Sequence, residues 1–148
     1  MAANPIPKGF HTVTPYLVVS GISKVIDFLK QAFEAVVTEG PMTRPDGTVM
    51  HAEVKIGDSM LMMGEPMGPW KAMPCVLYVY VSDVDAVYKK ALQAGTKSLQ
   101  EPANQFYGDR NAGVEDPGGN LWWIAMRKED VPPEEMAKRA QAAMKQRG

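Results

Sequence analysis

The sequence has little of three features that mark large classes of proteins. Only one of its 148 residues is a cysteine, Cys75, so no disulfide can form within the chain. The formal net charge is −1, so the chain lacks the excess of positive charge that binding to a nucleic acid or an anionic membrane requires. Neither a secretory leader nor an apolar run long enough to span a bilayer is visible. We therefore expect a cytoplasmic protein that binds neither nucleic acid nor membrane.

The chain contains a weak internal repeat. Residues 20–25 return 62 positions later as residues 82–87, and residues 57–63 return 61 positions later as residues 118–124. Two similar offsets at separate places indicate a duplicated unit of about sixty residues. Hydrophobic residues make up 45% of the chain, which is enough for a core shared by two closely packed half-domains.

Each half has the same order of hydrophobic patterns. Alternation and turn residues predict strands, and spacing of three and four predicts helices. The first half has a strand at 12–19, a helix from Ile22 to Phe33, and strands at 36–43, 48–56 and 59–65; after a linker at 66–74, the second half has a strand at 75–82, a helix at 84–92, and strands at 97–101, 106–114 and 120–127. A C-terminal helix follows at 132–146, with acidic residues at its start and basic residues at its end.

These patterns predict an α+β fold. Two tandem βαβββ modules, residues 12–65 and 75–127, form one domain over 12–128 with a concave, partly closed mixed sheet, and the C-terminal helix lies outside the repeat. We expect function on the concave surface, called the cup here, because paired half-units create a shared hollow there.

Strand alternation predicts which side chains line the cup. If Gly57 and Asp58 form a two-residue hairpin loop, Ile56 pairs with Ser59, Lys55 with Met60, and Glu53 with Met62. Directly paired residues share a face, and the repeat extends that face to the second half. The predicted ligand-binding residues are Tyr16, Met60, Met62, Tyr78, Tyr80, Arg110 and Trp123, and His51 and Glu53 are the candidate acid–base pair.

Two interpretations of this lining stay open. Aromatic and methionine side chains with a few polar groups suit a planar or hydrophobic organic ligand. Alternatively, Tyr78 and Tyr80 fill a closed barrel, and Glu53 pairs with Arg110 or Lys55 as an ordinary ion pair.

Several short segments resemble one known family. They are Thr14-Pro15-Tyr16-Leu17, residues 45–53, residues 56–59, Tyr107-Gly108-Asp109-Arg110, residues 114–120 and residues 129–136. With the duplicated unit, they make residues 12–137 similar to the vicinal oxygen chelate superfamily, which includes glyoxalase I, bleomycin-resistance proteins and extradiol dioxygenases. Within it the chain resembles the PhnB-like branch.

The resemblance implies where a metal would lie. Enzymes of this superfamily typically hold one divalent ion with His, Glu or Gln side chains from the first and last strands of each half. Those positions fall on Thr14, Leu61 or Met62, Val76 and Trp123, none of which is a good ligand. We therefore expect no metal at these positions and no cofactor. His11-Thr12 is similar to the His-Thr pair that opens the first strand of glyoxalase I, but it lies about three residues too early.

Three functions follow from these observations. The first is a metal-free protein that binds a small aromatic or hydrophobic molecule in a cup completed by a homodimer. The second is a lyase, isomerase or dioxygenase that uses a relocated metal around His51 and Glu53, or that pair as acid and base, although the sequence shows no third ligand. The third is a structural or regulatory dimer whose own side chains fill the cup.

Overall fold

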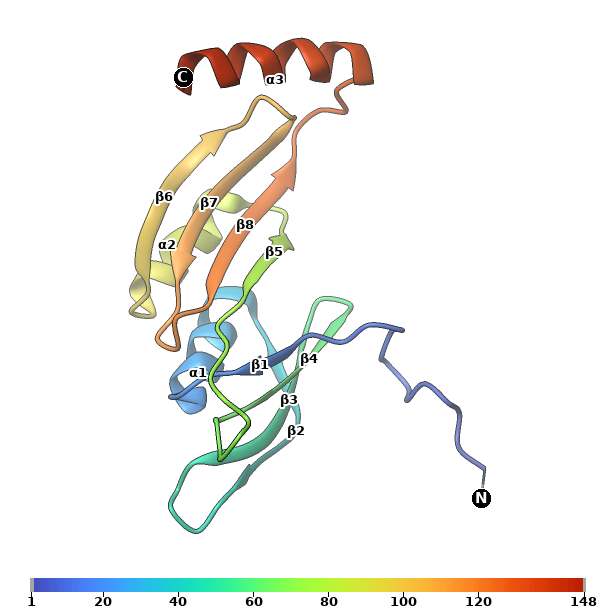
Figure 1. Ribbon diagram of the computed structural model, residues 1–148, viewed down its shortest axis with the longest axis vertical. Coiled ribbons are helices and arrows are strands. Elements are labelled where there is room, and N and C mark those ends of the chain that lie inside the picture. The colour runs from blue at the N-terminus through green and yellow to red at the C-terminus, as the bar shows by residue number, and fades with distance from the viewer. Residues whose placement is uncertain (1, 148) are drawn as a thin grey trace.

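The computed structural model describes residues 2–147 and confirms the duplicated modules (Figure 1). Module 1 contains β1 (Tyr16–Val18), α1 (Ile22–Phe33), β2 (Val36–Thr43), β3 (Val49–Ile56) and β4 (Ser59–Gly64); module 2 contains β5 (Val76–Tyr80), α2 (Val84–Gln93), β6 (Lys97–Asn104), β7 (Asp109–Glu115) and β8 (Leu121–Arg127). The chain ends in α3 (Pro133–Arg147), which crosses the end of the second sheet.

The two sheets have the same topology. Their strand orders are β1-β4-β3-β2 and β5-β8-β7-β6, with the first pair of each parallel and the others antiparallel. No strand ladder joins the two sheets among residues 2–147. The concave surface is therefore divided between two separate four-stranded sheets, and a single chain does not close it.

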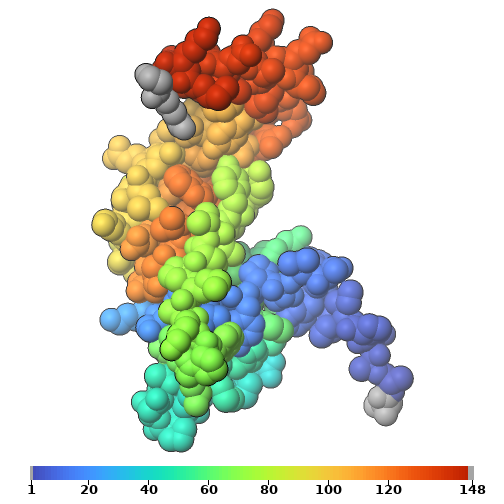
Figure 2. All heavy atoms as spheres, in the orientation of Figure 1, coloured from blue at the N-terminus to red at the C-terminus, as the bar shows by residue number. Residues whose placement is uncertain are grey.

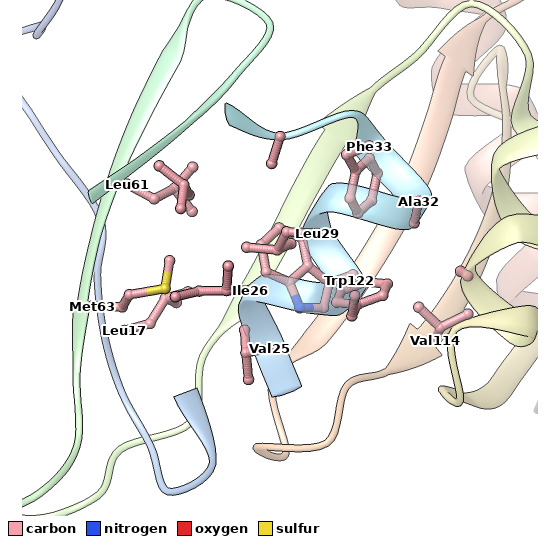
Figure 3. Close-up of a cluster of buried hydrophobic side chains, with 14 of the residues drawn as sticks. Leu17, Val25, Ile26, Leu29, Ala32, Phe33, Leu61, Met63, Val114 and Trp122 are labelled. Atoms are coloured by element: carbon pink, nitrogen blue, oxygen red, sulfur yellow. The ribbon is translucent and has the colours of Figure 1, made fainter. Parts of the chain in front are cut away.

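The modules meet through their helices and one tryptophan. Phe28 and Phe33 of α1 contact the ring of Trp122 on β8, with centroids 5.8 and 5.6 Å away. Trp122 is fully buried, as expected for a residue on the helix side of its strand. Figure 3 shows this core running from Leu17 and Met63 of module 1 to Val114 of module 2. Each sheet buries the face that carries its helix in this shared core. The opposite, concave face of each sheet therefore points away from the core.

Helix α1 begins without a side-chain cap. Its N-cap is Gly21 in a left-handed conformation, with φ of 76°, and the Glu65 carboxylate accepts a 2.8 Å hydrogen bond from the Gly21 amide. The second Glu65 oxygen accepts from the amide of Val49. Glu65, the residue after β4, therefore connects the residue before α1 to β3 and satisfies the Gly21 amide.

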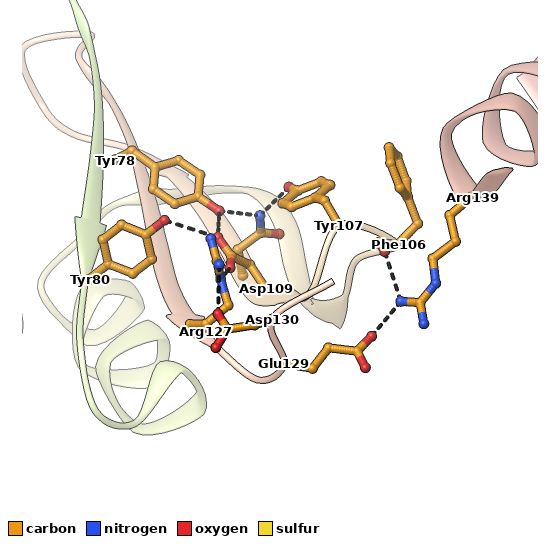
Figure 4. Close-up of polar contacts among 10 residues, drawn as sticks. Tyr78, Tyr80, Phe106, Tyr107, Asp109, Arg127, Glu129, Asp130 and Arg139 are labelled. Carbon is orange, nitrogen blue, oxygen red and sulfur yellow. Dashed lines mark hydrogen bonds and ion pairs between the residues drawn. The ribbon is translucent and has the colours of Figure 1, made fainter. Parts of the chain in front are cut away.

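Arg139 connects the C-terminal helix α3 to the second module. Its guanidinium donates to the carbonyl oxygen of Phe106 at 3.1 Å and pairs with Glu129 (Figure 4). None of the helices in the described part of the chain has the length and apolar character needed to cross a bilayer. Figure 2 shows the two modules as two lobes, with the N-terminal segment extending away from the lower lobe.

Candidate functional site

The predicted register of β3 and β4 is confirmed. Ile56 pairs with Ser59, Lys55 with Met60, and Glu53 with Met62. Ala52 and Val54 are fully buried beneath α1, so His51 and Glu53, which alternate with them, face the cup. The parallel pairing of Tyr16 with Met62 brings the Tyr16 side chain to the same face.

Three side chains form a hydrogen-bonded chain across this face. The Glu53 carboxylate lies 2.9 Å from His51 Nε2, and the Tyr16 hydroxyl lies 2.9 Å from His51 Nδ1. A carboxylate can only accept, so His51 Nε2 donates to Glu53, and in the tautomer with its hydrogen on Nε2 the Nδ1 atom accepts from the Tyr16 hydroxyl. Burial raises the pKa of Tyr16, which keeps the phenol protonated. The expected pair of His51 and Glu53 is thus assembled and extended by a third residue.

A second carboxylate lies beside this chain. Glu39 of β2 is paired directly with Glu53, and carboxylate oxygens of the two residues and a ring nitrogen of His51 all lie within 4.8 Å of one another. The sequence pattern did not identify Glu39. Its alternation within β2 is broken by β-bulges, so period-two counting fails there.

Apolar side chains border the three residues. Met60 is buried and Met62 is partly buried on the cup face, and the Trp70 ring packs edge-on against Tyr16 at 5.2 Å. Trp70 belongs to the connection between the modules, which the sequence marked only as a linker. The linker therefore contributes an aromatic wall to the cup face of module 1.

The cup face of module 2 is built around a buried carboxylate. Tyr78 and Tyr80 of β5 donate to Asp109 Oδ2 at 2.8 and 3.3 Å, and Arg127 donates to Asp109 Oδ1 at 2.7 Å (Figure 4). Burial opposes ionisation of Asp109, but these donors outweigh it and hold its pKa below the usual value. Burial raises the pKa of Tyr78. The two tyrosines are 41% and 59% exposed although their hydroxyls are bound to Asp109, so much of each side chain remains open to the cup.

Asn111 extends this network toward the β6–β7 connection. Its amide nitrogen donates to the hydroxyls of Tyr78 at 3.1 Å and Tyr107 at 2.7 Å. Its amide oxygen accepts from Gln100 at 2.9 Å and Gln105 at 3.0 Å. Asn111 therefore links the Tyr78 hydroxyl to side chains of β6 and of the β6–β7 connection.

Trp123 lies on the cup face, as predicted, and its ring covers Gly113. The two residues are directly paired between β7 and β8. A Cβ atom added to Gly113 would come within 2.6 Å of Trp123 Cζ3. Glycine at this position therefore leaves the space in which the indole lies against the strand.

The predicted position of Arg110 is wrong. Arg110 pairs with Met126 in the register of β7 and β8, which puts it on the helix side, and its guanidinium binds Asp85 of α2 at 2.8 Å. Trp123 comes ten positions after its partner Gly113, whereas Met62 comes nine positions after its partner Glu53. Relative to the β3–β4 hairpin, the β7–β8 hairpin therefore contains one extra residue. Transferring the face of β3 to β7 with a single repeat offset ignores this residue and assigns β7 to the wrong face. The true cup residues of β7 are Asp109, Asn111 and Gly113.

The positions that would carry the superfamily's metal have no suitable donor set. The described structure places Met62 beside Tyr16, Trp123 beside Tyr78, and Val76 beside Leu121. A thioether, an indole and an aliphatic side chain do not make a site for a hard or borderline divalent ion. Leu61, the alternative position on β4, is buried on the opposite face. These residues do not fit the expected ion.

A cavity of about 820 Å³ opens between the two modules. Its walls come from the N-terminal segment, the tip of the β3–β4 hairpin, the end of α1, and β5 with the start of α2. Met60, Tyr78 and Tyr80 line it. Leu61, Leu77 and Trp122, which face the helices, line it as well. The cavity is therefore a crevice between the modules that reaches three of the predicted ligand-binding residues, and it is not the cup face itself.

Two βαβββ modules with aromatic cup faces define a protein of the glyoxalase type. A sequence model of the glyoxalase/bleomycin resistance protein/dioxygenase superfamily matches residues 9–124, and the chain belongs to this superfamily. An uncharacterized protein of Mycobacterium bovis is 33% identical over all of this chain and 99% of its own length. An uncharacterized protein of Mycobacterium tuberculosis is also 33% identical, over all of this chain and 88% of its own length.

Solved structures share the fold at low sequence identity. TioX from Micromonospora sp. ML1 has a TM-score of 0.62 and 22% identity over 82% of this chain and 100% of that one. A glyoxalase/bleomycin resistance protein/dioxygenase from Nocardioides has a TM-score of 0.61 and 17% identity over 90% of both chains. At these identities the likeness shows the fold alone. Assignment to the PhnB-like branch stays a prediction.

Proposed function

We propose that this protein binds a small planar or hydrophobic organic molecule without a metal at the four strand positions typical of its superfamily. The observation that carries this proposal is the pair of Tyr78 and Tyr80, whose rings are open while their hydroxyls are held by buried Asp109. Aromatic faces fixed before binding lose little conformational entropy when a flat ligand stacks on them.

We further propose that two copies complete each cup. Large apolar side chains are exposed on the sheets of both modules, including Tyr16, Met42, Val76 and Tyr80. Exposed apolar patches of this kind commonly mark an interface or a ligand surface. In the proposed homodimer, the cup face of module 1 in one copy lies opposite the cup face of module 2 in the other. We also keep the cytoplasmic location that the sequence predicts as a proposal, with Cys75 as a free thiol.

Thermal shift measurements on a panel of planar aromatic compounds, in buffer containing EDTA, test the binding proposal. At least one compound should raise the melting temperature of the wild type, since a ligand that binds only the folded state stabilises it. The Tyr78→Ala/Tyr80→Ala variant should lose that rise. Met144→Ala removes an exposed apolar side chain of α3, outside the cup, and should retain it.

The binding proposal is contradicted if every compound changes the melting temperature of the wild type and of the double variant equally.

Sedimentation analysis tests the dimer separately. A species of monomer mass at all concentrations would contradict the two-copy cup, even if a compound binds.

A second candidate function is a lyase, isomerase or dioxygenase whose chemistry is relocated to His51 and Glu53. The specific observation that favours it is the hydrogen-bonded chain from Glu53 through His51 to Tyr16. A carboxylate that orients an imidazole, which in turn contacts a phenol, can move a proton to or from a bound molecule. Turnover of a compound that is lost in His51→Gln would favour this candidate over simple binding.

A further inference from the structure

We propose that Glu39, His51 and Glu53 form a binding site for one divalent d-block cation such as Zn²⁺ on the cup face of module 1. The site differs from the four strand positions where the superfamily's metal is expected. The inference goes beyond the binding function proposed above and does not depend on it, because the ion is held by this chain's own side chains.

The donor atoms form a compact set. One atom from each residue, a carboxylate oxygen of Glu39, a ring nitrogen of His51 and a carboxylate oxygen of Glu53, lies within 4.8 Å of the other two. Zinc bound by oxygen and nitrogen lies about 2.0 Å from each donor, so its ligands stand about 3.3 Å apart. The donor atoms must therefore move closer together than the 4.8 Å limit, and the exposed Glu39 side chain can rotate inward to bring its carboxylate nearer to His51 and Glu53. One imidazole with two carboxylates suits Zn²⁺ and neighbouring ions better than Ca²⁺ or Mg²⁺.

The β-bulge in β2 turns Glu39 toward the other two residues. Val37 pairs with Val54, yet Glu39 pairs with Glu53, so one extra residue, Thr38, lies between them. In a regular ladder Thr38 would be opposite Glu53, and Glu39 would point to the helix side. The bulge therefore supplies the third donor, and bulges commonly redirect a side chain in this way.

The backbone next to Glu39 is also adapted to this close approach. Gly40 has φ of +77°, a conformation that side chains other than glycine rarely adopt. A Cβ atom at Gly40 would come within 2.8 Å of the His51 carbonyl oxygen. Glycine thus allows β2 to lie close against β3 where the donors meet.

The charges of the three residues favour a cation. Like charges directly opposite each other destabilise a sheet, and Glu39 and Glu53 form such a pair. The Glu53 side chain is 12% exposed, and among the described residues its carboxylate has one side-chain partner, His51. The two carboxylates thus lie opposite each other on neighbouring strands, with one imidazole beside them. A divalent ion between them would neutralise both and use the remaining lone pairs of Glu53.

Tyr16 orients the imidazole for this role. The Tyr16 hydroxyl contacts His51 Nδ1 at 2.9 Å, which leaves Nε2 directed at the carboxylates. With Nε2 on the ion, the hydrogen moves to Nδ1 and is donated to the Tyr16 oxygen, as expected for an outer partner of a metal-bound histidine. Three protein donors leave a fourth position open to the cup, where an oxygen of a bound molecule can reach the ion.

The experiment is a titration of the chelator-treated full-length protein with Co²⁺, followed by visible absorption, and with Zn²⁺, followed by calorimetry. We expect one ion per chain and the visible bands of Co²⁺ in a low-symmetry protein site. Glu39→Gln and His51→Ala should each weaken the affinity at least ten-fold. Tyr16→Phe, which removes only the outer hydrogen bond, should weaken it by about ten-fold.

Two matched controls keep the result specific. His11→Ala removes the other histidine, which is exposed in the N-terminal segment, and Glu101→Gln removes an exposed glutamate on β6, the strand equivalent to β2. Both should leave the affinity unchanged. Because Glu39 is exposed, Glu39→Gln should fold like the wild type, so the test stands even if His51→Ala does not fold.

Two results would overturn the inference. One is that the wild type shows no saturable binding of Co²⁺ or Zn²⁺. The other is that Glu39→Gln binds the ion as tightly as the wild type, whereas His11→Ala no longer binds it. Both titrations contain no organic compound, so failure of the ion site leaves the thermal shift result for aromatic ligands to be judged separately.

Discussion

The hydroxyl of Tyr78 donates a 2.8 Å hydrogen bond to the carboxylate of Asp109, a residue 31 positions further along the chain. Asp109 is 3% exposed and also accepts from Tyr80 and Arg127, so four residues from three strands share one buried charge. This cluster sets the positions of the two aromatic rings on the cup face of module 2, and its removal should change both stability and ligand binding.

Asp109→Asn should destabilise the protein, because Asn offers one oxygen where two were used and cannot balance the charge of Arg127. Loss of buried hydrogen bonds of this kind costs about 1–3 kcal/mol of unfolding free energy. Urea denaturation followed by circular dichroism measures the change. Asp85→Asn breaks the exposed pair with Arg110 and is the control, with a much smaller effect. Equal losses in the two variants would show that the buried cluster has no special role.

Acidification should remove stability through the same carboxyl group. The pKa of Asp109 is lowered in the folded state, where burial is outweighed by hydrogen bonds from Tyr78 and Arg127, relative to about 3.9 in the unfolded chain. A group with a lowered folded-state pKa stabilises the protein above the unfolded-state pKa, and this contribution is lost as the pH falls through the folded-state value. Unfolding free energies measured from neutral to acidic pH should therefore fall more steeply below about pH 4 in the wild type than in Asp109→Asn. Parallel curves would contradict the assignment.

Gly113→Ala should displace the indole of Trp123, since the new methyl group would lie within 2.6 Å of the ring. Overpacking of this kind costs about 1–3 kcal/mol. Near-ultraviolet circular dichroism reports the changed environment of the tryptophan, and urea denaturation reports the cost. In the double variant Gly113→Ala/Trp123→Leu the clash is absent, so adding Gly113→Ala to Trp123→Leu should cost less than adding it to the wild type. An equal cost in both backgrounds would mean that backbone strain, and not the ring, requires glycine.

Phe28→Ala should weaken the packing between the two modules. Phe28 is fully buried and its ring meets Trp122 of the other module at 5.8 Å. Truncation of a buried phenylalanine costs about 3–5 kcal/mol. Denaturation should be followed by both tryptophan fluorescence and far-ultraviolet circular dichroism, because separate transitions would reveal modules that unfold independently. Phe106→Ala, at an exposed ring, is the control and should cost far less. A similar cost in the two variants would contradict a shared core.

Local sequence was sufficient to predict the β3–β4 hairpin and which of its residues lie on the cup face. The two-residue loop at Gly57 and Asp58 fixes the register of β3 and β4, and the alternation of β3 then assigns His51 and Glu53 to the cup. The burial of Trp122 followed from the same period-two rule on β8. These predictions succeeded because a short loop and a regular strand leave no freedom in register.

The rest of the candidate site depended on irregularities that no local pattern reveals. One extra residue in the β7–β8 connection put Asp109 and Asn111 on the cup and moved Arg110 to the helix side. One extra residue in β2 turned Glu39 toward His51.

The sequence by itself therefore determined the duplicated α+β modules, the superfamily resemblance and the regular hairpin, because hydrophobic periodicity and turn chemistry act over a few residues. Only the tertiary structure decided which carboxylates meet His51 and which hold Tyr78 and Tyr80. A shift of one residue between strands exchanges the two faces of a sheet, and such a shift is set by contacts between residues far apart in the chain.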